Sequence, residues 1–327
     1  MKAYVYGSAN VLQCEDLEKP TPGDDQVLIK VRAASLNPLD YHLLRHPFIR
    51  HMLSVPSKAK ITRAGRDVAG QVEAVGRKVT QFKPGDAVFG SCAGAFAEYV
   101  CTSQLALAMK PENASFEQAA SVPVAGLTAL QALRKAEIQP GQRVLMNGAA
   151  GGVGTFTVQI AKSLGANVTG VCSTRNVDMV RLLGADHVID YTREDFTKSG
   201  QRYDVIFDVV ANHSFNARKG VLNPKGIYIG AGMIGFDGSG IDLLISQINE
   251  FVLSRFVSQR FVWFMARISK EDLTTLGDLI QAGTITPVID KTYPLSEVPA
   301  AIDYLEEKHA RGKVVITVDS APEPNSF

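Results

Sequence analysis

The sequence has few cysteines, almost no net charge and no long hydrophobic run, which is typical of an ordinary globular protein. It has four cysteines in 327 residues and no C-x-x-C pair, so neither a disulfide framework nor a structural zinc lobe is expected. Its 34 Lys and Arg residues balance 33 Asp and Glu residues, and a net charge of +1 argues against nucleic acid as the main partner. No apolar run reaches the roughly 18 residues that a membrane helix needs, and the N-terminus shows no secretory h-region. We therefore expect a soluble, cytoplasmic protein without a membrane segment.

The composition supports a well-formed core in more than one domain. Apolar residues make up 46% of the chain and charged residues 20%. At about 150 residues per domain, this length predicts roughly two domains.

The first 120 residues predict a β-rich region. Alternating apolar residues indicate strands, separated by turns rich in Pro, Gly and Asp, at Val27–Ala33, Gly70–Val75, Ala87–Phe89 and Ala97–Cys101. Helical spacing follows over Glu117–Leu133, with a break at Pro123.

Strands and helices then alternate, which predicts βαβ units and a parallel sheet. The segments are Arg143–Asn147, Val153–Leu164, Asn167–Cys172, Val177–Leu183, His187–Ile189, Tyr203–Val209 and Gly226–Ala231. The remaining pattern predicts helices at Ile241–Phe256, Lys270–Ala282 and Val298–Lys308, strands at Phe261–Ile268 and Lys313–Val318, and a disordered tail over 321–327.

A glycine-rich loop lies between the strand that ends at Asn147 and the helix that opens near Val153. A strand before the loop, a helix after it and a second strand some twenty residues on are typical of dinucleotide binding. The N–H groups of Ala150, Gly151, Gly152 and Val153 would then face a pyrophosphate. Gly151 allows the ligand to approach, and Gly154 allows the helix to pack against the strand.

Further motifs run through nearly the whole chain: SLNPLDY (35–41), GRDVAGQVEAVG (65–76), KPGDAVFG (83–90), GAFAEY (94–99), PVAGLTALQAL (123–133), GAAGGVG (148–154), LGADHVIDY (183–191) and ARGKVVI (310–316). With them the sequence resembles the medium-chain dehydrogenase/reductase superfamily, and in particular its zinc-free quinone oxidoreductase branch related to zeta-crystallin. The resemblance implies an α/β protein with a GroES-like β-rich catalytic domain from residues 1–122 and 266–327. It also implies a Rossmann cofactor domain, a doubly wound parallel sheet, over residues 123–265, with the catalytic cleft between the two domains.

The zinc ligands of the related alcohol dehydrogenases are replaced in this sequence. The early cysteine corresponds to Asn37, the histidine of the G-H-E motif to Arg66, and the late cysteine to Val124. An amide, a guanidinium and a valine do not form a tetrahedral N/S site. We therefore expect no zinc, and without a Lewis acid a conjugated acceptor is easier to reduce than an unactivated alcohol is to oxidise.

The cofactor is predicted to be NADP(H). The second strand of the glycine-loop unit ends without the acid that binds a ribose 2′-hydroxyl, whereas Ser173 and Arg175 can contact a 2′-phosphate. The resemblance adds Tyr191 near the adenosine phosphate and Lys313 near the cofactor. Asn147 and Ala231 are expected to border the ribose and the nicotinamide.

Four residues are candidates for the chemistry. Asn37 could donate its amide N–H to a developing oxyanion, and the resemblance places Thr128 near the nicotinamide. Either Tyr41 or His42 could supply a proton, although solvent protonation stays open.

The charged residues around these candidates have predicted supporting roles. Asp40 and Asp67 are expected to brace the site by hydrogen bonding. Arg66 either steers a substrate or pairs with Asp67.

These residues predict a zinc-independent, NADPH-dependent oxidoreductase that transfers hydride to quinones or α,β-unsaturated carbonyls. Two alternatives remain: an enone or alkenal C=C reductase as the main activity, and an NADPH-binding regulatory or structural protein. The apolar segment Phe261–Ile268 would form the late edge of the parallel sheet, and in related reductases this strand pairs with its two-fold mate. A homodimer is therefore expected.

Overall fold

The computed structural model describes residues 1–7, 11–46, 62–231, 255, 257–307 and 310–318. It divides into two compact units, of which unit 1 comprises Met1–Leu127 and Ile268–Phe327 and unit 2 comprises Thr128–Arg267. The helix predicted at Ile241–Phe256 and the tail predicted at 321–327 lie outside the described residues.

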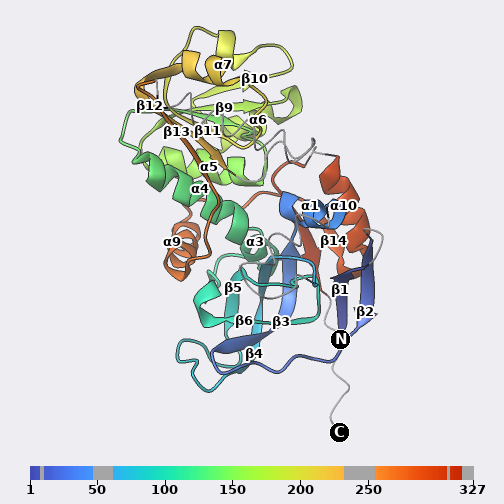
Figure 1. Ribbon diagram of the computed structural model, residues 1–327. Helices are drawn as coiled ribbons and strands as arrows, with labels where there is room; N and C mark the ends of the chain where they lie inside the picture. The colour runs from blue at the N-terminus through green and yellow to red at the C-terminus, as the bar shows by residue number, and fades with distance from the viewer. Residues whose placement is uncertain (8–10, 47–61, 232–254, 256, 308–309, 319–327) are drawn as a thin grey trace. The chain divides into compact units, whose positions relative to one another are not determined.

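Unit 2 is built around a six-stranded parallel sheet with the strand order β10-β9-β8-β11-β12-β13 (Figure 1). The strands are β8 (Arg143–Asn147), β9 (Asn167–Cys172), β10 (His187–Asp190), β11 (Tyr203–Asp208), β12 (Leu222–Ala231) and β13 (Arg260–Phe264). Along the chain, the sheet starts with the central strand β8 and adds β9 and β10 on one side. It then adds β11, β12 and β13 on the other side. This is the doubly wound Rossmann arrangement that the alternating pattern predicts.

Helices connect these parallel strands and cover the sheet. They are α5 (Gly152–Ser163), α6 (Val177–Leu182) and α7 (Phe215–Gly220). The sheet core includes Leu145, Ile206 and Tyr228, each with no exposed surface, and Phe196 lies among them. Such full burial of a large apolar side chain stabilises the fold by about 1.5–3 kcal/mol.

Unit 1 holds a second sheet with the order β14-β15-β3-β4-β5-β7, and β6 pairs with β3. The strands are β3 (Gln26–Ser35), β4 (Asp67–Val75), β5 (Ala87–Ser91), β6 (Tyr99–Ser103), β7 (Leu107–Met109), β14 (Ile289–Pro294) and β15 (Lys313–Thr317). A hairpin of β1 (Lys2–Tyr6) and β2 (Leu12–Asp16) bridges to this region at Ala3 and Val5. Strand β15 joins the sheet antiparallel to β3, so the two ends of the chain complete one core.

The described helices of unit 1 are α1 (Pro38–Arg45), α3 (Phe116–Ala120), α9 (Lys270–Gln281) and α10 (Val298–Glu306). Helix α4 (Pro123–Ala136) begins at the proline that the sequence marks as a helix break, and it crosses the boundary between the units at Leu127.

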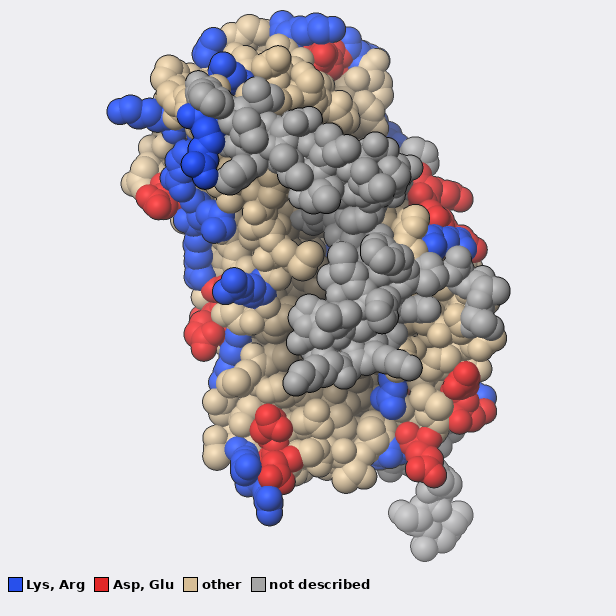
Figure 2. All heavy atoms as spheres, in the orientation of Figure 1, with Lys and Arg blue, Asp and Glu red and all other residues tan. Residues whose placement is uncertain are grey.

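The GroES-like and Rossmann architecture predicted from the sequence is confirmed. None of the described helices is long and apolar enough to cross a membrane. The face in Figure 2 carries both cationic and anionic side chains, in keeping with the balanced charge of the sequence.

Candidate functional site

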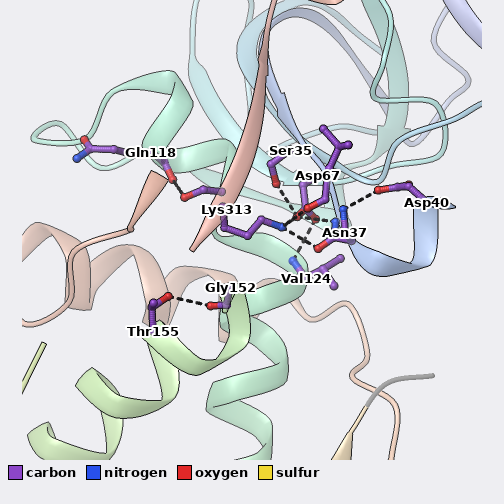
Figure 3. Close-up of polar contacts among 11 residues, drawn as sticks. Ser35, Asn37, Asp40, Asp67, Gln118, Val124, Gly152, Thr155 and Lys313 are labelled. Carbon is purple, nitrogen blue, oxygen red and sulfur yellow. Dashed lines mark hydrogen bonds and ion pairs between the residues drawn. The ribbon is translucent and has the colours of Figure 1, made fainter. Parts of the chain in front are cut away.

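Asn37 precedes the first helix of unit 1, and both the nitrogen and the oxygen of its side-chain amide are hydrogen-bonded. It stands directly before α1 as the N-cap, and its backbone N–H donates to Asp40 Oδ2 over 2.8 Å. Its side chain is buried, with Nδ2 donating to Asp67 Oδ2 at 2.9 Å and Oδ1 accepting from Lys313 Nζ at 2.7 Å (Figure 3). The residue that the resemblance places at the first zinc-ligand position is therefore an amide that is hydrogen-bonded through both its nitrogen and its oxygen.

Asp67 is the centre of this cluster and is completely buried. Its Oδ2 accepts from Ser35 Oγ at 3.0 Å, and its Oδ1 accepts from the backbone N–H of Val124 at 3.0 Å. Lys313 Nζ lies 3.2 Å from Asp67 Oδ2. Among the described residues, the ion-pair partner of Asp67 is therefore Lys313 and not Arg66. Asp67 thus braces the site by hydrogen bonding, as the sequence predicts.

Asp40 is a buried carboxyl group in the first turn of α1. Its Oδ2 receives the N–H of Asn37, while Oδ1 has no hydrogen-bond partner among the residues that the structure describes. The pKa of Asp40 is raised to about 7, chiefly by burial and also by the nearby charge of Asp67, while the hydrogen bond from Asn37 N–H and the charges of Lys313 and Arg66 oppose the shift. Asp40 therefore titrates near neutral pH.

The other predicted catalytic residues lie on α1 and α4. Tyr41 is half-buried, His42 is buried, and their ring centroids are 4.3 Å apart. Thr128 is buried one turn after Val124 on α4, so the two residues share a face of that helix. These positions leave either Tyr41 or His42 as the candidate proton donor.

The glycine loop of unit 2 has little side-chain bulk beside its backbone. A Cβ at Gly151 would meet only the carbonyl oxygen of Gly148, at 3.6 Å, so a ligand can approach the backbone there. Gly151 is the N-cap of α5, has no side chain to cap the helix, and donates its N–H to Gly148 O at 3.2 Å. At Gly154 a Cβ would lie 2.1 Å from Gly148 O, so only glycine allows this helix to pack so closely.

The parallel sheet brings most of the predicted cofactor residues to one edge. Parallel strands place their carboxyl ends together, and there the structure has Asn147, Ser173, Arg175, Tyr191 and Ala231. Arg175 and Tyr191 are exposed, whereas Asn147 and Ala231 are buried. Ala150 is also buried, and Gly152 and Val153 are half-buried at the start of α5.

Lys313 is placed differently from these residues, because it lies in unit 1. Its ammonium group donates to Leu36 O at 2.8 Å as well as to Asn37 and Asp67. All three N–H groups have an acceptor, so direct contact with a cofactor would require one of these bonds to break.

Sequence reasoning missed a second buried network, at the end of β11. Asp208 has no exposed surface, and its Oδ1 accepts from Asn147 Nδ2 at 2.9 Å. Its Oδ2 accepts from Tyr228 Oη at 3.1 Å. Asn147 Nδ2 also donates to Asn212 Oδ1 at 3.2 Å, so the oxygen of the Asn147 amide is the atom left to bind a ligand hydroxyl. The only sequence signal was a lone acid that closes an apolar strand.

Asp190 at the end of β10 was missed as well. Its Oδ2 accepts from Thr174 Oγ1 at 2.6 Å, and its Oδ1 accepts from the backbone N–H and the hydroxyl of Thr192 at 3.0 and 2.7 Å. The hydrogen bond from Thr174 is the main cause that lowers the pKa of Asp190. This acid ties the Ser173–Arg175 loop to the neighbouring strand.

The described residues contain no group of three or more His, Cys, Asp or Glu side chains that could hold a metal. Burial raises the pKa of the Cys92 thiol, and it raises that of Cys172 to about 11, so neither is a ready nucleophile.

Comparisons with known proteins match this architecture. A family described as "Alcohol dehydrogenase GroES-like domain" matches residues 23–112, and one described as "Zinc-binding dehydrogenase" matches residues 183–316. The mitochondrial NAD(P)H oxidoreductase RTN4IP1 of Mus musculus is 36% identical, over 90% of this chain and 82% of its own. The chloroplastic NADPH-dependent alkenal/one oxidoreductase of Arabidopsis thaliana is 34% identical, over 97% and 79%. The solved quinone oxidoreductase of Coxiella burnetii superposes with a TM-score of 0.85, at 32% identity over 98% and 99%.

These likenesses settle the family. The chain belongs to the medium-chain dehydrogenase/reductase superfamily. Within it, the chain is a quinone-oxidoreductase-like reductase, as the sequence predicts.

Proposed function

We propose that this protein is a zinc-independent, NADPH-dependent oxidoreductase that transfers hydride to quinones or α,β-unsaturated carbonyls. The observation that carries the proposal is the buried Asn37 amide, which is held by Lys313 and Asp67 at a lost zinc-ligand position. A neutral N–H donor stabilises an oxyanion less than a metal does, so it suits an acceptor whose charge spreads over a conjugated system. The names of the Arabidopsis and Coxiella relatives include both acceptor classes.

The residues of unit 2 fit an NADP(H) cofactor. The N–H groups at Gly152 and Val153 would hold the pyrophosphate beside the open backbone of Gly151, whose own N–H donates to Gly148 O at 3.2 Å, and the buried Ala150 lies in the same turn. Asn147 and Ala231 would border the ribose and the nicotinamide, and the exposed loop with Ser173 and Arg175, together with Tyr191, would take the 2′-phosphate. When bound, NADPH supplies the hydride.

The residues of unit 1 would act on the substrate oxygen. Asn37 would donate an N–H to the oxygen as negative charge develops on it. His42 or Tyr41 would deliver the proton, whereas Thr128, which belongs to unit 2, would contact the nicotinamide. The donor set at the lost zinc positions, an amide beside an ammonium, does not bind Zn²⁺ well.

The test is a panel of acceptors offered to the purified protein with NADPH. We expect NADPH to be consumed with small quinones or with enones, at the same rates after dialysis against a chelator. We expect no NADPH to form from NADP⁺ and simple alcohols. A clear preference for enones would identify C=C reduction as the main activity. Tight NADPH binding without turnover of any acceptor would contradict the enzyme assignment and favour an NADPH-binding regulatory protein.

The proposed compartment is the cytoplasm. Because two of the relatives are named as mitochondrial and chloroplastic, cell fractionation of the native protein is the appropriate test.

A further inference from the structure

The charges on the two sides of the Asn37 amide permit a single orientation of that amide. Lys313 Nζ lies 2.7 Å from one amide atom and carries only donors, so that atom must be the oxygen. Asp67 Oδ2 lies 2.9 Å from the other amide atom and carries only acceptors, so that atom must be the nitrogen. A flipped amide would face a cation with its N–H groups and an anion with its oxygen.

The sheet of unit 1 fixes these partners. Ser35 pairs in register with Asp67 across β3 and β4, and with Val315 across β3 and β15, so the start of β15 lies beside the residues that follow Ser35. Ser35 Oγ and the N–H of Val124 hold the carboxylate of Asp67, while Leu36 O holds the ammonium of Lys313. Lys313 and Asp67 are 4% and 0% exposed on their side chains, so water does not loosen the arrangement.

This orientation leaves one donor for a ligand. Of the two hydrogens on Asn37 Nδ2, one is directed to Asp67, and the second has no acceptor among the described residues. Attraction of the amide oxygen by the ammonium polarises the group and strengthens that remaining N–H as a donor.

We propose that Lys313 and Asp67 are positioning residues, which act through Asn37 by presenting one polarised N–H of its amide to the carbonyl oxygen of the acceptor. This inference rests on the proposed function, in which Asn37 stabilises the developing oxyanion. It assigns to Lys313 an effect on the substrate oxygen that is separate from any role in cofactor binding.

The test removes both charges together, because a single change would leave its partner charged and buried. In Lys313→Met with Asp67→Asn, the amide loses its fixed polarity, and kcat should fall roughly tenfold to a hundredfold while the Kd of NADPH stays within about twofold. The matched control is Lys162→Met with Asp186→Asn, which removes a 2.8 Å ion pair of unit 2. The control should keep the wild-type kcat.

The role of Asn37 as intermediary is tested by combination. Asn37→Ala should lower kcat about as much as or more than the charge-free variant, and adding the two charge substitutions to Asn37→Ala should cause no further loss. Losses that multiply in the combined variant, or a folded charge-free variant with wild-type kcat, would overturn the proposal.

A second measurement does not depend on turnover. The two side-chain NH₂ hydrogens of Asn37, assigned by their absence in Asn37→Ala, should exchange at different rates in the wild type, the one bonded to Asp67 more slowly, and this difference should shrink in the charge-free variant, which lacks the carboxylate acceptor. Unchanged signals in that variant would overturn the inference. A wild-type protein that reduced no acceptor would contradict the proposed function, and these signals would still decide the orientation of the amide.

Discussion

At the scale of single residues, Asp40 links proton binding to stability. Its pKa is raised from 3.8 to about 7 by burial, so between these pH values the folded state holds a proton that the unfolded state has lost. The stabilisation is fully present below the unfolded pKa and is lost as pH rises through the folded one. The slope for one such group is about 1.4 kcal/mol per pH unit.

Asp40→Asn imitates the protonated carboxyl and cannot ionise. We therefore expect the variant to gain stability relative to wild type as pH rises from about 4 to 7, with a constant difference above that range. Urea unfolding at several pH values measures this. Asp178→Asn, at a side chain that is 94% exposed, is the control and should run parallel to wild type. A parallel profile for Asp40→Asn would show that Asp40 titrates normally.

Residue identities suggested the candidate site residues but did not predict the contacts among them. The replacement of zinc ligands by Asn37 and Val124 is a prediction that rests on the resemblance of the surrounding motifs to those of the family. The pairing of Lys313 with Asp67 is not visible, because the two residues are 246 positions apart and meet only through the order of strands in the sheet. The same holds for Asn147 and Asp208, which end neighbouring parallel strands.

At the scale of elements, strongly patterned segments were predicted well and weakly patterned ones were not. The bounds of β8 and β9 follow the sequence prediction because both strands are apolar on both faces. Strand β14, with the sequence IDKTYP and no buried residue, was missed, and so was the short polar helix α7. Both depend on tertiary contacts that local periodicity does not record.

The loop after β9 supports a prediction about cofactor choice. Asp190 and Thr174 fix this loop, so Arg175 can meet a 2′-phosphate with a charge-assisted contact of about 1.5–3 kcal/mol. Arg175→Ala should weaken NADPH binding by roughly 10- to 100-fold and change NADH binding little. Because the contact is the same in the ground and transition states, KM for NADPH should rise while kcat is nearly kept.

Titration with both cofactors measures this effect. Arg181→Ala, at a 62% exposed arginine on the next helix, is the matched control and should keep both affinities. An unchanged preference for NADPH over NADH in Arg175→Ala would place the phosphate site elsewhere. Equal losses with both cofactors would mean that Arg175 supports the loop instead.

At the scale of the whole molecule, the sheet of unit 2 raises the question of assembly. Strand β13 closes this sheet, and among the described residues it pairs with β12 alone. Its side chains Phe261, Val262, Trp263 and Phe264 are half-buried. An unpaired apolar edge of this kind is an aggregation hazard unless another strand or element covers it.

We predict that β13 pairs with its counterpart in a second copy, so that the protein is a homodimer at micromolar concentration. Met265 and Ile268, which follow the strand, are 62% and 44% exposed in one copy, and a partner that pairs along this edge would cover them. Because both side chains face solvent in the single chain, Met265→Lys with Ile268→Lys should fold normally yet place charges in the interface. Light scattering should report twice the 35.3 kDa chain mass for wild type and the single mass for this variant.

The control is Leu182→Lys, which changes a side chain that is 88% exposed on α6 and should leave the protein dimeric. A monomeric wild type would contradict the prediction, and a variant that stays dimeric would move the interface away from β13.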